Sequence, residues 1–433
     1  MNLAKKNADK NGGTTGAGSG AGSGAGSGAG SGAGAAAANG TGDSGVFTIL
    51  RGARVFAPAD LGKVDVLFAG ERVLAVGDGI AAQTAAGWPA VEEVDLSGLW
   101  LIPGLVDLHE HFTGGGGEGG PVTRTPEVTL TMLTTAGVTT AVGCLGTDAV
   151  TRSMEALIAK ARALEAEGIT TRIWTGAYQV PTPTLTGSVR SDIALIDKVI
   201  GAGEIALSDH RSAQPTIEEL RKMAAECRVG GMLGGKPGLL HLHMGGAPRG
   251  LSPILEIVGE GEIPASQFYP THCSRNSALV DQAAQLTQMG GHADFTAGAS
   301  AAARVGECLT QGADVNKLSI SSDGGGSLPR FNERGQLVGL GVGSPVTLLA
   351  TVRDLVKQKV MDIPTAVSLA TAHPAEAIGL GTRKGGLTAG ADADAVAVDQ
   401  DFNVRYVWAR GRLMVAQGKP VVFGTFERPV EHE

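Results

Sequence analysis

The sequence has few cysteines, no long apolar run and little excess charge. Its 4 Cys include no C-x-x-C pair, so they do not form a disulfide framework. No apolar run reaches the roughly 18 residues that a membrane helix requires. The 35 Lys and Arg against 43 Asp and Glu give a net charge of −8, without a basic run, which argues against a nucleic-acid partner. These absences predict a cytoplasmic enzyme or binding protein with a large core.

The first forty-odd residues lack the apolar pattern of a folded segment. A Gly-Ala-Gly-Ser repeat runs from Gly16 to about Gly34 and is followed by four alanines. Such repeats behave as flexible coil, and no continuous apolar stretch suggests a signal peptide. We expect residues 1–44 to be a disordered leader without a catalytic role.

Short β-like runs occur at both ends of the remaining chain. Their sequences lie at residues 46–50, 64–68, 73–76, 91–94, 395–398, 404–408, 413–415 and 421–422. Gly, Asp and Pro separate them, as is typical of a small sheet. We therefore expect one small β-sandwich domain built from residues 45–99 and 386–426.

The middle of the chain, residues 100–385, alternates between strand-like and helix-like patterns. The strand-like runs are 101–106, 138–145, 172–178, 204–208, 239–244, 268–272, 293–296 and 318–322, with helical patterns such as 154–167, 217–228 and 279–289 between them. Eight such alternations predict an α/β fold, a (β/α)₈ TIM-type barrel. Barrels of this kind place their chemistry at the carboxyl ends of the strands.

The first predicted barrel strand ends in two histidines, His109 and His111. Alternate residues of a strand share a face, so both imidazoles point the same way and Glu110 points the other way. Two imidazoles on one face can bind a divalent metal ion. By itself the pair fits two surface histidines equally well.

Three further residues of metal-binding type stand at predicted strand ends. His243 ends the fifth strand, His272 the sixth and Asp323 the eighth. Coincidence does not account for so many, and we expect a metal site at this end of the barrel. His241 shares a strand face with His243 but lies one layer deeper, in the predicted barrel interior.

Several motifs resemble those of a known family. The run at residues 102–111 resembles the opening of the amidohydrolase superfamily barrel. The motifs at 114–118, 123–127, 145–148, 175–178, 208–212, 234–238 and 321–324 resemble those of the bacterial isoaspartyl dipeptidases. The resemblance covers roughly residues 46–426.

The resemblance implies two divalent metal ions, expected to be Zn²⁺. The implied ligands are His109, His111 and Asp323 for the first, and His243 and His272 for the second, with a bridging carboxylate. In most members of the family a carbamylated lysine bridges the metals. Counting back from residues 208–210, that position falls on Glu204; counting forward from Tyr178 it falls on Gly203. One residue has therefore been inserted before Glu204, which we expect to be the bridge.

The resemblance also implies a substrate site for a small dipeptide. Glu118 is expected to bind the ammonium group, and Arg211 and Arg275 the terminal carboxylate. Thr147, Ser327 and the backbone of Gly116 are expected to bind the aspartyl α-carboxylate. Asp323 would move the proton and Tyr178 would stabilise the oxyanion. The predicted function is metal-dependent hydrolysis of the isopeptide bond of β-aspartyl dipeptides by a bridging hydroxide.

Two other functions remain open at this point. One is an amidohydrolase acting on a cyclic amide, such as a dihydroorotase or hydantoinase. The other is a non-catalytic scaffold on the same fold. The residue that follows the β-aspartyl group is also open, and a β-Asp-Arg dipeptide is among the choices. By analogy with the family, we expect a homo-oligomer.

Overall fold

The computed structural model describes residues 47–84, 88, 91–331 and 337–428. The described residues belong to the second of two compact units, residues 44–433. The predicted leader, residues 1–44, lies outside the described residues.

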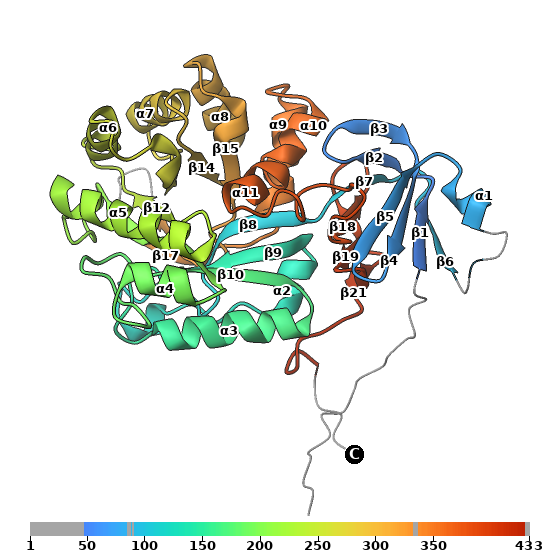
Figure 1. Ribbon diagram of the computed structural model, residues 1–433, viewed down its shortest axis with the longest axis horizontal. Coiled ribbons are helices and arrows are strands. Elements are labelled where there is room, and N and C mark those ends of the chain that lie inside the picture. Colours follow the sequence, from blue (N-terminus) through green and yellow to red (C-terminus); the bar gives the residue numbers. More distant parts are fainter. Residues whose placement is uncertain (1–46, 85–87, 89–90, 332–336, 429–433) are drawn as a thin grey trace, which may run out of the picture. The chain divides into compact units, whose positions relative to one another are not determined.

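Eight parallel strands form the centre of the second unit, and helices cover their outer side (Figure 1). The strands are β8 (Leu105–Glu110), β9 (Val138–Gly143), β10 (Thr170–Thr175), β11 (Val199–Leu207), β12 (Leu239–Met244), β13 (Phe268–Thr271), β14 (Ala293–Thr296) and β15 (Leu318–Ser321). The helices are α2 (Leu130–Thr134), α3 (Met154–Glu167), α4 (Val189–Leu195), α5 (Ile217–Gly234), α6 (Ser252–Gly259), α7 (Ser277–Gln288), α8 (Ala301–Thr310), α9 (Thr347–Lys357), α10 (Ile363–Ser368) and α11 (Ala372–Ala377).

Backbone hydrogen bonds join these strands into a closed ring. Strands β8 to β13 pair in chain order and β14 pairs with β15. Past the end of β13, the amide of Cys273 donates to the carbonyl of Asp294 in β14 at 3.1 Å. On the other side, the amide of His111 donates to the carbonyl of Gly324 at 2.7 Å. The ring confirms the predicted α/β class and TIM-type barrel.

Two barrel-strand predictions differ most from the structure. The predicted run 101–106 divides at Gly104 into β7 (Trp100–Pro103), which joins the small sheets, and β8 of the barrel. A Cβ at Gly104 would lie 2.1 Å from Thr139 Oγ1, so only glycine fits at this crossing. The fourth barrel strand begins at Val199 instead of residue 204, because Val199, Gly201 and Ala202 also pair with β10 or β12.

The two chain ends build two sheets. The first contains β1 (Phe47–Arg51), β4 (Asp65–Ala69), β5 (Arg72–Gly77) and β6 (Val91–Asp95). The second contains β2 (Arg54–Phe56), β3 (Asp60–Lys63), β7, β18 (Ala395–Val398), β19 (Val404–Ala409), β20 (Arg412–Ala416) and β21 (Lys419–Pro420). Phe68 and Trp408, from different sheets, share one apolar cluster, as expected of a sandwich. The strand predicted at 421–422 is wrong, because its pairing with β20 ends at Pro420.

The short helix α1 (Ile80–Thr84) lies beside β4 and β5, and an antiparallel hairpin of β16 (Ser327–Phe331) and β17 (Leu337–Val342) follows the last barrel strand. Three single-turn 3₁₀ helices complete the elements: η1 (Pro121–Thr123), η2 (Ala265–Gln267) and η3 (Val315–Lys317). None of the described helices is long and apolar enough to cross a membrane.

Candidate metal and substrate site

The six predicted metal ligands meet at the carboxyl-terminal ends of the barrel strands. The carboxylate of Glu204 lies at their centre. Its oxygens are 3.4 Å from His109 Nε2, 3.6 Å from His111 Nε2, 3.1 Å from His243 Nδ1 and 3.7 Å from His272 Nε2. Asp323 Oδ1 is 3.1 Å from His111 Nε2 and 3.5 Å from His109 Nε2. One carboxylate therefore faces all four imidazoles, and a second faces two of them.

Local backbone geometry directs these side chains inward. His109 and His111 lie on one strand face, with their Nε2 atoms 3.4 Å apart. His272 and Asp323 have φ values of 61° and 55°, which non-glycine residues seldom adopt and which occur most often at functional sites. His272 directly follows β13 and Asp323 lies two residues after the end of β15, where the chain turns away from the barrel.

A β-bulge presents Glu204. Ala202 of β11 pairs with Leu240 of β12, and Ile205 pairs with Leu242, so β11 carries one extra residue against its neighbour. Bulges of this kind re-aim a side chain next to active sites. The extra residue lies where the sequence indicated an insertion before Glu204.

Electrostatics keep the two carboxylates ionised. Burial acts to raise the pKa of Glu204, but His109 and His243 hold it well below its ordinary value. Burial likewise opposes ionisation of Asp323, but the hydrogen bond to His111 and the charges of His109, His272 and His111 together outweigh it, so the pKa of Asp323 is lowered. Burial, followed by the charge of His243, lowers the pKa of His272 to about 3. His272 is thus neutral at pH 7 and has a lone pair available for a metal ion.

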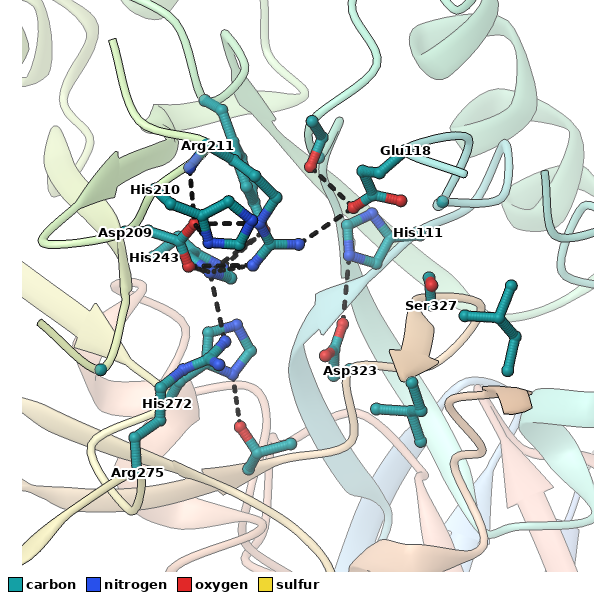
Figure 2. A pocket seen from close by; sticks show the side chains of 18 of the residues that line it. His111, Glu118, Asp209, His210, Arg211, His243, His272, Arg275, Asp323 and Ser327 are labelled. Carbon is teal, nitrogen blue, oxygen red and sulfur yellow. Dashed lines mark hydrogen bonds and ion pairs between the residues drawn. The ribbon is translucent and has the colours of Figure 1, made fainter. Parts of the chain in front are cut away.

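The predicted substrate residues line a cavity of about 800 Å³ above this cluster (Figure 2). Its lining includes all six of them: Gly116, Glu118, Thr147, Arg211, Arg275 and Ser327. Gly116 has φ of 70°, and a Cβ there would lie 2.5 Å from the carbonyl oxygen of Thr123. Glycine is therefore required for the loop that carries Glu118 to fold back on itself.

Glu118 and Arg211 contact each other within this cavity. Arg211 Nη1 donates to Glu118 Oε1 at 2.9 Å (Figure 2). The hydroxyl of Thr147 donates to the same oxygen at 3.0 Å. Arg211 also donates through Nε and Nη2 to both oxygens of Asp209, each at 2.9 Å. The guanidinium of Arg211 is thereby held between two carboxylates, with Asp209 fixing its plane.

Tyr178 lies at the junction between the ligand cluster and the substrate residues. Its hydroxyl is 2.7 Å from His243 Nδ1, and the guanidinium of Arg211 lies 5.4 Å from the centre of its ring. Burial raises the pKa of Tyr178 well above its ordinary value, and the charge of Glu204 adds to this. The hydroxyl therefore keeps its proton and can act as a hydrogen-bond donor.

Three residues near the ligands have no role in the sequence-based prediction. Asp209 Oδ2 lies 3.3 Å from His243 Nε2, and Cys144 Sγ lies 3.8 Å from His111 Nδ1. Thr296 Oγ1 lies 2.5 Å from His272 Nδ1. Asp209 belongs to the motif at residues 208–212, and Cys144 follows β9. Only the folded chain shows which imidazole each of them contacts.

The residues fit metal ions. Ligand atoms of His109, His111, Cys144 and Glu204 lie within 4.8 Å of one another, as do those of Glu204, His243 and His272. Glu204 belongs to both groups, and its buried Oε1 has no hydrogen-bond partner in the described part of the chain. A buried carboxylate oxygen among imidazoles without such a partner is suited to a cation.

A parallel barrel whose strand ends gather four imidazoles and two carboxylates defines a metal-dependent hydrolase of the amidohydrolase fold. The amidohydrolase family profile matches residues 272–414. The chain is 43% identical to the β-aspartyl dipeptidase of Fervidobacterium islandicum, solved in complex with β-Asp-Leu. The match covers 86% of this chain and 98% of that one, with a TM-score of 0.79. The chain therefore belongs to the β-aspartyl dipeptidases of the amidohydrolase superfamily and is a hydrolytic enzyme.

The chain is also similar to a second structure of this dipeptidase and, over a short stretch, to a deacetylase. A second structure of the Fervidobacterium islandicum enzyme is 41% identical, with the same coverage of both chains and a TM-score of 0.79. The N-acetylglucosamine-6-phosphate deacetylase of Bos taurus is 35% identical over 80 residues, 18% of this chain. That match spans only 20% of the length of the deacetylase.

Proposed function

We propose that this enzyme hydrolyses the isopeptide bond of β-aspartyl dipeptides at two divalent metal ions, with a bridging hydroxide as nucleophile. One observation carries the proposal: a single cavity joins the imidazole and carboxylate cluster to Glu118, Arg211 and Arg275. A β-aspartyl dipeptide has one ammonium and two carboxylate groups around its isopeptide bond. A site for it needs an anionic group and several anion-binding groups close to the ligands.

The charged residues match the groups of such a dipeptide. Arg211 and Arg275 each place Nη2 3.2 Å from His243 Nε2, so both guanidinium groups border the proposed metal site. We propose that they bind the terminal carboxylate. Glu118 accepts from Arg211 and Thr147 through Oε1 alone, and a carboxylate has about four acceptor positions. It can therefore also accept the ammonium group.

The aspartyl α-carboxylate is assigned to a second set of donors. Ser327, the Gly116 backbone and Thr147 are its proposed donors. Gly116 and Ser327 are neighbours, since a Cβ on Gly116 would lie 3.2 Å from that of Ser327. The hydroxyl of Thr147 donates to Glu118 here, so substrate binding would redirect this donor.

We propose that His109, His111 and Asp323 hold one metal ion, that His243 and His272 hold the other, and that Glu204 bridges them. When bound, such ions lower the pKa of water toward about 7 and polarise the scissile carbonyl. Imidazole and carboxylate ligands at closely spaced strand ends favour zinc. Asp323, ionised beside His111, can accept a proton and return it to the leaving amine. Tyr178, which keeps its proton, can donate to the oxyanion.

Glu204 replaces the carbamylated lysine in this proposal, and the bulge compensates for its shorter side chain. A carbamate forms reversibly from CO₂, whereas a glutamate needs no modification. Metal loading should therefore be independent of added bicarbonate. Glu204→Gln should lose most of one zinc equivalent, because an amide oxygen is a poor bridge between two cations.

Zinc analysis of the purified proteins, with and without bicarbonate, tests the bridge. Glu307→Gln, a change on the outer helix α8, is the matched control and should keep full loading. If Glu204→Gln retains two tightly bound ions and full turnover, the bridge lies elsewhere.

A cyclic amide is the second candidate substrate. Dihydroorotate and hydantoins contain no ammonium group to match Glu118, and a simple hydantoin also lacks a carboxylate to match Arg275, so a ring is disfavoured. The non-catalytic scaffold is excluded, because the chain belongs to a family of hydrolytic enzymes.

Rates on matched dipeptides test the function. We expect β-Asp-Leu to be hydrolysed and α-Asp-Leu to be hydrolysed poorly. When Glu118, Arg211 and Arg275 bind the charged groups of the α-linked isomer, its amide lies away from the proposed metal ions. Dihydroorotate and a hydantoin serve as the cyclic comparison. Equal rates on the two Asp-Leu isomers, or faster turnover of a cyclic amide, would show that the proposed substrate is wrong. Adding β-Asp-Arg to the panel identifies the preferred leaving residue.

The cellular location and the oligomeric state of the enzyme are further proposals. We propose a cytoplasmic enzyme, supported by the four cysteines, which are all free thiols and buried. By analogy with the family we also propose a homo-oligomer. Gel filtration with light scattering tests the second proposal.

A further inference from the structure

His241 is a fifth buried histidine beside the proposed ligands. It lies in β12, two residues before His243, and is fully buried. Its ring stacks on Trp174, with ring centres 4.8 Å apart and planes 19° from parallel. The indole Nε1 of Trp174 in turn donates to the carbonyl of Leu108 at 2.9 Å. This packing fixes the plane of the His241 imidazole.

Both nitrogens of His241 have defined neighbours. Nδ1 lies 3.0 Å from the carbonyl oxygen of Tyr269, and Nε2 lies 3.2 Å from Nδ1 of His109. A carbonyl oxygen only accepts hydrogen bonds, so Nδ1 of His241 carries a proton and donates it. In a neutral imidazole, Nε2 is then the acceptor.

The acceptor at Nε2 decides the tautomer of His109. His109 directs Nε2 toward Glu204 and Asp323, where the metal ion is proposed, so this nitrogen needs its lone pair. The single proton of a neutral His109 then lies on Nδ1 and requires an acceptor. Among the contacts of the described residues, His241 Nε2 fills that position.

We propose that His241 is a positioning residue for metal binding, which accepts a hydrogen bond from His109 Nδ1 and so holds Nε2 of His109 toward the metal ion. This inference rests on the proposed ligand role of His109. His109 then donates a hydrogen bond to His241, and His241 donates one to the carbonyl of Tyr269. Partners of this kind fix the orientation and tautomer of ligand imidazoles, and their loss weakens metal binding about 10- to 100-fold.

His109 differs from the other proposed ligands in its partner. The outer nitrogen of His243 contacts the carboxylate of Asp209, and that of His111 contacts the thiol of Cys144. The outer nitrogen of His272 contacts the hydroxyl of Thr296. Within the described chain, His109 is the one proposed ligand whose outer partner, His241, is a second imidazole. Replacing His241 changes no carboxylate of the site. The His109 position can therefore be tested separately.

The test compares two side chains of similar length and flexibility at position 241. His241→Gln keeps an oxygen acceptor within reach of His109, whereas His241→Met keeps the volume but replaces the acceptor with a weakly accepting thioether. His292→Gln is the control, because His292 packs 5.3 Å from the Tyr269 ring without contacting a proposed ligand in the structure. Zinc affinity is measured by chelator competition on the full-length protein, and folding of the apoprotein by thermal melting.

We expect His241→Met to weaken one zinc equivalent about 10- to 100-fold and to leave the other unchanged. His241→Gln should recover most of that loss, and His292→Gln should bind like the unmodified enzyme. The visible spectrum of the Co²⁺-loaded protein should change in His241→Met alone, since it reports the ligand geometry.

Two results would overturn the inference. One is zinc affinity in a folded His241→Met protein equal to that of the unmodified enzyme. The other is an equal loss in His241→Gln and His241→Met, which would assign the effect to packing. Measurements on the unmodified protein distinguish failure of this inference from failure of the proposed function. If that protein binds two zinc ions but cleaves no β-aspartyl dipeptide, only the proposed substrate is wrong.

Discussion

At the scale of single residues, the site depends on which nitrogen of each imidazole faces inward. His109, His111 and His272 direct Nε2 toward Glu204, whereas His243 directs Nδ1. A strand pattern predicts the face on which a histidine lies but not the nitrogen that it presents. Contacts from other strands decide that, so the outer partners could not be predicted.

The residue with the sharpest predicted effect is Asp323. Asp323→Asn keeps the shape of the side chain but removes the charge that would accept a proton. We expect turnover of β-Asp-Leu to fall by at least about 10²-fold, as for the loss of a general base. Zinc content must be measured in the same sample, because Asp323 is also a proposed ligand.

Asp401→Asn is the control for this change, since Asp401 lies on the surface and pairs with Lys357. Its turnover should match that of the unmodified enzyme. An Asp323→Asn protein that retains most of its activity would show that another group moves the proton.

At the scale of secondary-structure elements, segments with a continuous apolar pattern or a helical period were predicted well, and strands without such a pattern were missed. Residues 154–167, 239–244, 293–296 and 395–398 form elements with the predicted bounds. The three- and four-residue strands β2 and β3 and the hairpin β16–β17 were missed. Each of these strands contains Gly or a charged residue and lacks a clear apolar alternation. Pairing with neighbouring strands stabilises them instead.

A buried ionic cluster joins the returning chain end to the barrel. Lys384 donates to Asp392 at 2.8 Å, to Asp394 at 2.6 Å and to Thr170, at the start of β10, at 2.7 Å. Breaking a buried pair by removing one partner costs about 3–5 kcal/mol, because the remaining charge stays desolvated. Lys384→Met should therefore lower the free energy of unfolding by about that amount.

Denaturant unfolding of Lys384→Met measures this loss, and Lys357→Met is the control. Lys357 forms an exposed pair with Asp401, which should contribute only about 0–1 kcal/mol. Equal destabilisation by both changes would contradict the prediction.

The same cluster predicts a pH dependence. Burial opposes ionisation of Asp392, but Lys384 and Arg383 together outweigh it and lower the pKa of Asp392 below its ordinary value of 3.8. A depressed folded-state pKa gives stability that is present above the unfolded pKa and lost as pH falls through the folded one. The difference between Lys384→Met and the unmodified protein should thus narrow below about pH 4. A difference that stays constant down to pH 2 would contradict this.

At the scale of the whole molecule, the leader is predicted to be dispensable. Its Gly, Ala and Ser repeat supplies no apolar pattern that could form a core. A chain that begins at residue 41 should keep the melting temperature and the turnover of the full chain. A marked loss of either would mean that residues 1–40 contribute to the folded enzyme.

The sequence by itself determined the class of fold and the residue types at the strand ends, because periodicity and motif spacing are local properties of a chain. Closure of the barrel brings together His109, Glu204 and Asp323, which are far apart in sequence. The structure shows their distances, the pairing of Glu118 with Arg211, and the acceptor that His241 offers to His109. These contacts join different strands and loops, so only the tertiary structure could decide them.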